Sequence, residues 1–324
     1  MDETHGVLRS QSAQEFDVLG LGSVAVDEML YVDAWPAPDE KLRVQHRERR
    51  CGGLTGVALL AAAKLGARCA YAGRLGYDPA SQFIEETFHA AGIDTAHTTR
   101  GEDCRVVQST IIVATRTATR NVFSHSPGGT GADEAAPPAE VIEAARVLCV
   151  DHHGIAGSIR AARIARAAGR AVVADFERWD DPRFAELFAS IDHVILSLGF
   201  AQRLTRCADA PSAVNAIWTA ERKLAAVTDG AHGCWFRTES DARVRHQPAL
   251  PIEAVDTTSC GDVFHGAYAA ALAEDRSIDD ALRFATVAAS LKAGRRGGSD
   301  ALPTREEIAA AIDRLGPALV ESAP

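Results

Sequence analysis

Short apolar segments recur along the chain, and most of them alternate with alanine- and arginine-rich stretches of helical character. Unbroken apolar runs of this length are typical of strands that are covered on both faces, as in a parallel sheet. The alternation therefore predicts an α/β fold with a mainly parallel sheet and crossover helices. The predicted strands are residues 17–21, 69–72, 146–150, 171–174, 193–196 and 225–228.

Two segments, residues 28–49 and 105–125, do not follow this rhythm. In them β-branched and polar residues alternate, as in residues 106–113, which is the period of a half-exposed strand. We expect them to pair as a small β-sheet outside the core. Between them, residues 56–64 read as a buried helix that ends at Gly66.

Composition narrows the class of protein. The 324 residues are 47% hydrophobic and 24% charged, with a net charge of −10, which argues against a surface built to bind nucleic acid or an anionic membrane. The 7 cysteines are scattered singly, so neither a disulfide framework nor a zinc cluster is indicated, and a reducing cytoplasm fits best. The polar residues 1–15 lack an apolar core and are predicted to be a disordered tail before one domain over residues 16–318.

The strongest chemical signal lies in residues 255–272, where a run of small residues ends in Gly-Asp and opens an apolar helix. The backbone N–H groups of Ser259, Cys260 and Gly261 would converge there and form an anion hole at the positive helix end. Asp262 beside them could accept the proton of a hydroxyl that is being phosphorylated. We expect the helix end to favour its ionised form. An acidic residue that merely caps the helix is the structural alternative.

This passage resembles the C-terminal signature D-T-x-G-A-G-D of the ribokinase-like PfkB carbohydrate kinases. Asp256, Thr257, Gly261 and Asp262 match it, whereas Ser259 and Cys260 replace the usual Gly and Ala. The resemblance extends over residues 17–315. It implies a ribokinase-like αβα sandwich with a small β-sheet lid from about residues 28–49 and 105–125. It also implies ATP with Mg²⁺, and a monovalent cation such as K⁺ beside Asp256 and Thr258.

On the acceptor side, Asp27 follows the first strand in the place of the family's substrate-binding aspartate, and Gly52 and Gly53 resemble its glycine pair. The asparagine that usually follows this pair is replaced by Val57, so contacts to the sugar are altered. Two polar residues of the lid segments, Lys41 and Gln108, are further substrate candidates.

On the nucleotide side, residues 227–234 resemble the family's T-x-G-x-x-G loop, with Thr228, Gly230 and Gly233 at the matching positions. Residues 288–298 resemble the helix and glycine-rich turn that flank adenine, which makes Ala288 and Lys292 candidates. The family often carries N-x-x-E after the preceding strand and uses it in a water-mediated metal network, but Ser197 and Phe200 stand at these two positions.

Several alternatives stay open. Some motifs look similar to the sulfofructose-kinase-like branch, and a nucleoside kinase or a non-catalytic sugar or nucleotide sensor would fit the same fold. Residues 20–25 match the dinucleotide pattern G-x-G-x-x-A, but the next segment alternates like a strand, which argues against a dehydrogenase. No Walker-A string occurs. We expect a homodimer paired through the lid, with a small-molecule substrate.

Overall fold

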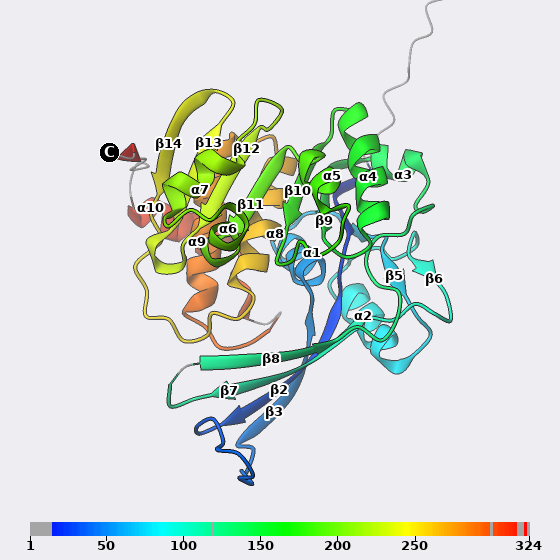
Figure 1. The fold of residues 1–324 in the computed structure, drawn as a ribbon, viewed down its shortest axis with the longest axis vertical. Helices are drawn as coiled ribbons and strands as arrows, with labels where there is room; N and C mark the ends of the chain where they lie inside the picture. Colours follow the sequence, from blue (N-terminus) through cyan, green and yellow to red (C-terminus); the bar gives the residue numbers. More distant parts are fainter. Residues whose placement is uncertain (1–14, 118, 299–300, 316–320, 323–324) are drawn as a thin grey trace, which may run out of the picture.

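A nine-stranded sheet forms the centre of the computed structural model, which describes residues 15–117, 119–298, 301–315 and 321–322 (Figure 1). Six neighbouring strands are parallel, and three antiparallel strands extend one edge. The predicted α/β fold with a mainly parallel sheet is confirmed. The predicted tail lies outside the described residues except for Glu15. The sheet order is β15-β14-β13-β12-β11-β10-β9-β1-β4.

The six predicted strands all belong to this sheet. They are β1 (Phe16–Leu21), β4 (Cys69–Tyr71), β9 (Ala145–Asp151), β10 (Ala171–Asp175), β11 (His193–Ser197) and β12 (Leu224–Thr228). The antiparallel strands, which the apolar runs did not indicate, are β13 (Cys234–Thr238), β14 (Asp241–Gln247) and β15 (Glu321–Ser322). A separate pair consists of β5 (Arg74–Leu75) and β6 (Thr99–Arg100).

Helices cover both faces of the sheet, and successive strand residues point into two separate cores. Val147 and Cys149, for example, face one core, whereas Leu148 and Val150 face the other. The first core contains α1 (Leu54–Lys64), α2 (Pro79–Ala90), α8 (Cys260–Ala273), α9 (Ile278–Ala293) and α10 (Arg305–Leu315). The second contains α3 (Ala139–Glu143), α4 (Ile155–Ala167), α5 (Phe184–Ala189), α6 (Leu198–Thr205) and α7 (Ala210–Ile217).

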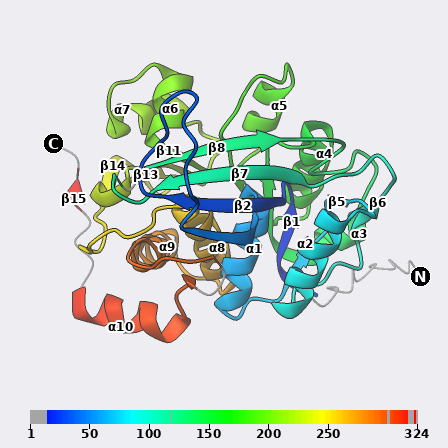
Figure 2. The ribbon, with the colours of Figure 1, turned by 90° about the horizontal axis from the view of Figure 1, so that it is seen from below.

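The two alternating segments form the predicted small sheet, which projects from the body as a lid (Figures 1 and 2). Its strands are β2 (Ala25–Val32), β3 (His46–Gly52), β7 (Val107–Ala114) and β8 (Thr119–His125), in the order β3-β2-β7-β8. Strand β2 follows β1 after a short turn, so no helix succeeds the G-x-G-x-x-A pattern. A helix in that place is what a dinucleotide pyrophosphate needs, and the dehydrogenase alternative therefore fails.

Helices α1 and α8 approach each other closely because Gly266 has no side chain. An added Cβ would overlap the carbonyl oxygen of Ala58. We expect Gly266→Ala to lower the free energy of unfolding by about 1–3 kcal/mol, although alanine favours helices. Gly261→Ala in the same helix is the control for this denaturation measurement, because its added Cβ would meet no atom within 4 Å. Equal stability of both variants would contradict the close packing.

Among the described residues, no helix combines the length and the apolar character needed to cross a membrane.

Candidate active site

The carboxyl ends of the parallel strands meet at one edge of the sheet, where ligands of open α/β folds bind. Strands β9 and β10 end in Asp151 and Asp175, and β11 and β12 end in Ser197 and Thr228. The lid begins at the same edge, directly after β1. This geometry places the lid strands and four polar strand ends around one region.

The start of helix α8 carries the residues that the sequence singled out. Ser259 is its N-cap residue and has a left-handed backbone with φ 60°, in the position where the family signature has glycine. Gly261 is exposed at the helix start with open space around it. The half-buried Asp262 lies in the first turn. The helix start is therefore accessible, with its N–H groups beside the carboxylate.

The electrostatics of Asp262 differ from the sequence expectation. Burial, followed by the negative charges of Asp175 and Glu177, raises the pKa of Asp262 well above 3.8. His265 and the Ser259 hydroxyl lower it by smaller amounts. The helix end was expected to favour the ionised form of Asp262, but the net pKa is raised because burial and the nearby like charges disfavour the carboxylate. A raised pKa makes Asp262 a better proton acceptor.

Three residues near Asp262 were missed by the sequence analysis. Asp175 Oδ2 lies 3.2 Å from His265 Nδ1, and burial also raises the pKa of Asp175. The His265 ring is held between the carbonyl oxygens of Gly261, at 2.9 Å, and Ile195, at 3.1 Å. The exposed Glu177 is close enough for its negative charge to raise the pKa of Asp262. The available signal was the position of Asp175 at the carboxyl end of a parallel strand.

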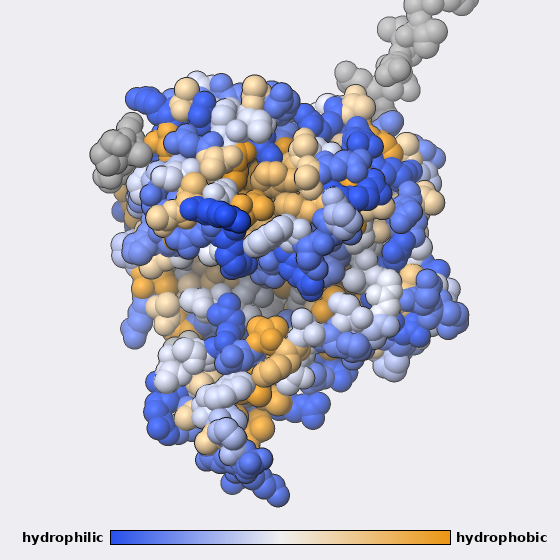
Figure 3. Space-filling view, in the orientation of Figure 1, coloured by the Kyte–Doolittle hydropathy of each residue, from blue (hydrophilic) through white to orange (hydrophobic). Residues whose placement is uncertain are grey.

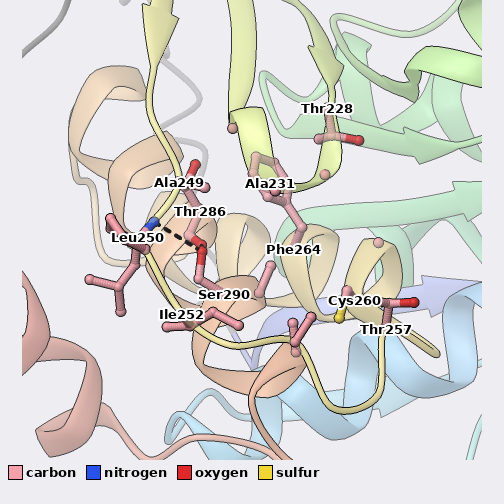
Figure 4. Close-up of a pocket in the computed structure, with 17 residues that line it drawn as sticks. Thr228, Ala231, Ala249, Leu250, Ile252, Thr257, Cys260, Phe264, Thr286 and Ser290 are labelled. Atoms are coloured by element: carbon pink, nitrogen blue, oxygen red, sulfur yellow. Dashed lines mark hydrogen bonds between the residues drawn. The ribbon is translucent and has the colours of Figure 1, made fainter. Parts of the chain in front are cut away.

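A cleft of about 340 Å³ leads from the helix start along α9 (Figure 4). Thr228, Gly230 and Gly233 line one side, and Cys260 and Gly261 line the end nearest the helix start. Gly230 and Gly233 have φ 51° and 95°, a conformation that favours glycine. Apolar side chains form most of the remaining wall, and the Leu250 N–H donates to Ser290 Oγ at 3.2 Å there. These wall residues include Leu250, Ile252, Phe264, Ala289 and Ala293.

Three predicted nucleotide residues do not line this cleft. Ser197 is the N-cap of α6, where its Oγ accepts from the Phe200 N–H at 3.4 Å, and Phe200 is buried in the core. Ala288 is fully buried inside the first core. Lys292 points away from the cleft toward Asp256, with 3.0 Å between its Nζ and the Asp256 carbonyl oxygen.

The acceptor side is organised around Asp27, which pairs with Arg50 in β3 and Ser109 in β7. Burial raises the pKa of Asp27 to about 6, while the Ser109 hydroxyl and the Arg50 charge lower it. An added Cβ on Gly52 would overlap the Asp27 carboxylate, so a larger residue there would force that carboxylate to move. Gly53 caps α1 with φ 85°.

Two lid candidates lie elsewhere. Gln108 is exposed on the lid face opposite to Asp27, because side chains alternate along β7 and Ser109 is the residue on the Asp27 face. Lys41 is exposed in the loop that joins β2 and β3 at the far end of the lid (Figure 1). The structure brings neither side chain to Asp27. Val57, in contrast, lines a small pocket together with Asp27, Arg50 and Lys292.

The loop before α8 is held from two sides. Asp256 Oδ1 accepts from the Thr258 N–H at 2.9 Å, and its Oδ2 lies 3.6 Å from Arg50 of the lid. From strand β8, Arg120 donates to Thr257 Oγ1 at 3.0 Å. A cleft of about 300 Å³ remains between this loop and the lid. Figure 3 shows that the molecule is hollowed between the body and the lid.

Comparison with known proteins decides which family has this arrangement. Residues 17–305 match the family described as pfkB family carbohydrate kinase. The chain belongs to this family. Its members transfer a phosphoryl group to a carbohydrate, and this PfkB kinase is accordingly an ATP-dependent carbohydrate kinase. The sulfofructose-kinase-like branch stays a prediction.

Individual relatives agree with this membership. Ribokinase of Haemophilus influenzae is 28% identical to this PfkB kinase over 298 residues, which cover 89% of this chain and 95% of the relative. The ATP-dependent ribose-1-phosphate kinase of Halopiger xanaduensis is 27% identical over 305 residues, which cover 90% and 97%.

Solved structures share the fold. An Agrobacterium tumefaciens protein assigned as a ribokinase superposes with a TM-score of 0.86 at 28% identity, covering 92% of this chain and 97% of that one. Arabidopsis thaliana ribokinase, solved with ribose and ATP, has a TM-score of 0.77 at 22% identity over 91% and 97%, which is evidence for the fold alone.

Proposed function

We propose that this kinase phosphorylates a hydroxyl of a sugar or sugar-like small molecule, with Asp262 as the catalytic base. The observation that carries the proposal is the position of Asp262 at the open start of α8. There a half-buried carboxylate of raised pKa directly follows Gly261, which has free space around it and lines the end of the cleft nearest the helix start. Proton acceptor and anion hole are then adjacent.

The reaction follows from this placement. The acceptor hydroxyl gives its proton to the Asp262 carboxylate as its oxygen bonds to the γ-phosphorus of ATP. The bond from that phosphorus to the β–γ bridging oxygen breaks, and ADP leaves. The N–H groups of Ser259, Cys260 and Gly261 stabilise the negative charge on the transferring oxygens. The apolar walls of the 340 Å³ cleft hold the adenine.

Magnesium fits the donor chemistry of this region. Asp175 and Glu177 are close enough to Asp262 to raise its pKa, and Mg²⁺ prefers carboxylate and phosphate oxygens. They are the residues that would hold Mg²⁺ with the ATP phosphates in the absence of the N-x-x-E pair. When bound, the ion neutralises phosphate charge.

Asp27 would accept hydrogen bonds from acceptor hydroxyls. Its carboxylate lies against Gly52, where the absence of a side chain leaves room for it. The lid would close over the acceptor and exclude water, so that ATP phosphorylates the acceptor and is not hydrolysed. Arg50 and Arg120 already reach from the lid to residues 256 and 257. These two contacts support a lid that moves together with the loop before α8.

Acceptor binding should weaken as the pH falls through about 6. Burial raises the Asp27 pKa to about 6, and only the carboxylate form accepts two hydroxyl protons. The test is calorimetric titration of the acceptor from pH 5 to 8 in the Asp262→Asn background, so that Asp262 does not titrate. Adding Asp27→Asn should weaken binding at pH 8 and remove the pH dependence. An unchanged inflection in the double variant would assign it to another group.

ADP formation with a panel of acceptors tests the function itself. The panel contains ribose, ketoses, phosphorylated and sulfonated ketoses, and nucleosides, each with ATP and Mg²⁺. We expect turnover that depends on one class of sugar. Turnover with nucleosides alone would identify a nucleoside kinase. Binding of ATP or sugar without any turnover would overturn the proposal in favour of a sensor on the same fold.

We also propose a homodimer that forms through the outer face of the lid. The side chain of Phe123 is on the face opposite to Asp27, is 54% exposed, and stacks on Trp35, which is 46% exposed. Exposed apolar clusters of this kind are typical of interfaces. Sedimentation should give a dimer that Phe123→Glu dissociates.

The seven free cysteines are consistent with a reducing cytoplasm.

A further inference from the structure

Lys292 is a buried lysine in the last turn of α9, and only 1% of it is exposed. Lysine is rarely buried to this extent unless its ammonium group has anionic or carbonyl partners. Its Nζ donates to the carbonyl oxygen of Asp256 at 3.0 Å and lies 3.7 Å from Asp256 Oδ2. Both contacts lead to Asp256, in the loop that precedes α8.

The same loop is tied to α9 through its backbone. The N–H groups of Val255 and Asp256 donate to the Ala293 carbonyl oxygen at 2.7 and 3.1 Å. Lys292 adds a positive charge at the negative end of α9. The loop that carries Ser259 and Asp262 is thus fixed to α9 through the backbone and through one ammonium group.

These contacts conflict with a bound monovalent cation beside Asp256 and Thr258. Such an ion needs carbonyl and carboxylate oxygens, but the Asp256 carbonyl already accepts from Lys292. Asp256 Oδ1 accepts from the Thr258 N–H, and Oδ2 faces Arg50 and Lys292. A further positive ion would have to approach two charged side chains in a buried place.

We propose that the Lys292 ammonium group is a built-in monovalent cation, and that this kinase works without K⁺. An alkyl ammonium resembles NH₄⁺ and K⁺ in charge and size, and can hold the same oxygens without being taken up from solution. The role of the loop in phosphoryl transfer rests on the function proposed above. The position of the charge rests on the contacts of Lys292 alone.

Wild-type protein in different salts gives the first test. Melting temperature and acceptor-dependent ADP formation are measured in equal concentrations of potassium, sodium and tetramethylammonium chloride. Both should stay the same, with turnover within about twofold. Stimulation of the wild-type enzyme several-fold by K⁺ would overturn the proposal. The melting experiment needs no substrate, so it remains decisive if the proposed acceptor chemistry fails.

Lys292→Ala removes the ammonium group and leaves space for an ion. The variant should melt at a lower temperature and lose roughly tenfold or more in turnover because the loop shifts. Both losses should be reduced by K⁺, Rb⁺ or NH₄⁺, but not by tetramethylammonium, which is too large. Rb⁺-soaked crystals should show an anomalous peak beside the Asp256 carbonyl oxygen in the variant and none in the wild type. A folded variant that no ion restores, with no Rb⁺ peak, would contradict the assignment.

Two controls separate this role from general loss of stability. Lys64→Ala removes an exposed lysine from the last turn of α1 and should show no cation effect. Lys292→Met keeps the side-chain volume but lacks the charge, so its losses should not respond to any cation. If Lys292→Ala does not fold in any salt, the wild-type salt series and Rb⁺-soaked wild-type crystals still decide the question, since a Rb⁺ peak beside Asp256 in the wild type would contradict the proposal.

Discussion

Asp262→Asn is expected to lower kcat by about 10²- to 10⁴-fold while making the protein more stable. The loss follows because asparagine cannot accept the proton of the acceptor hydroxyl. The gain in stability follows from the raised pKa of Asp262, since burial and the charges of Asp175 and Glu177 disfavour the carboxylate in the folded state. Each unit of such a shift corresponds to about 1.4 kcal/mol.

The sign of the pH dependence can be stated. The folded protein binds the Asp262 proton more tightly than the unfolded chain, whose pKa is near 3.8. The wild type therefore loses stability relative to the variant as the pH rises from about 3.8 to the folded pKa. Denaturant titrations of both proteins at pH 4 and pH 8 measure this difference, which should be larger at pH 8.

The matched control is Asp280→Asn, because Asp280 occupies the equivalent position in the first turn of α9. It is exposed and bonded to the N-cap Ser277, so its replacement should reduce stability slightly and leave kcat unchanged. An Asp262→Asn enzyme with near wild-type kcat would exclude Asp262 as the base. A less stable Asp262→Asn protein would contradict the electrostatic account.

Gly52→Ala is expected to raise the KM for the acceptor by roughly 10- to 150-fold with a smaller effect on the KM for ATP. The added methyl group overlaps the Asp27 carboxylate and forces it away from the acceptor. Loss of one hydrogen bond to a charged group corresponds to about 1.5–3 kcal/mol, which gives this range. Steady-state kinetics with each substrate varied in turn measure the two KM values.

Gly56→Ala is the control for this variant. Gly56 lies in the adjoining helix α1, and the nearest atom to its added Cβ would be Val24 Cγ1 at 3.3 Å. Only a small adjustment is needed, so the acceptor KM should change by less than about twofold. Equal effects of both variants would mean that Gly52 acts through general packing and not through Asp27.

The sequence by itself determined the layout of the fold. Each buried parallel strand is a local apolar run, and the crossover helices are rich in alanine and arginine. The six parallel strands of the main sheet and helix α1 could therefore be recognised without knowing their partners. The lid segments, residues 28–49 and 105–125, could also be recognised locally, because β-branched and polar residues alternate along them. The start of α8 was also local, because the anion hole and Asp262 lie within four consecutive residues.

Tertiary structure decided what depends on residues far apart in the chain. The raised pKa of Asp262 comes from Asp175 and Glu177, some 85 positions earlier, and outweighs the helix end that the sequence made visible. Which face of β7 reaches Asp27 depends on the register with β2, so Ser109 and not Gln108 lies there. Lys292, which resembled a nucleotide contact, proved to be directed at Asp256, because the direction of a buried side chain is set by the packing of α9 against the loop.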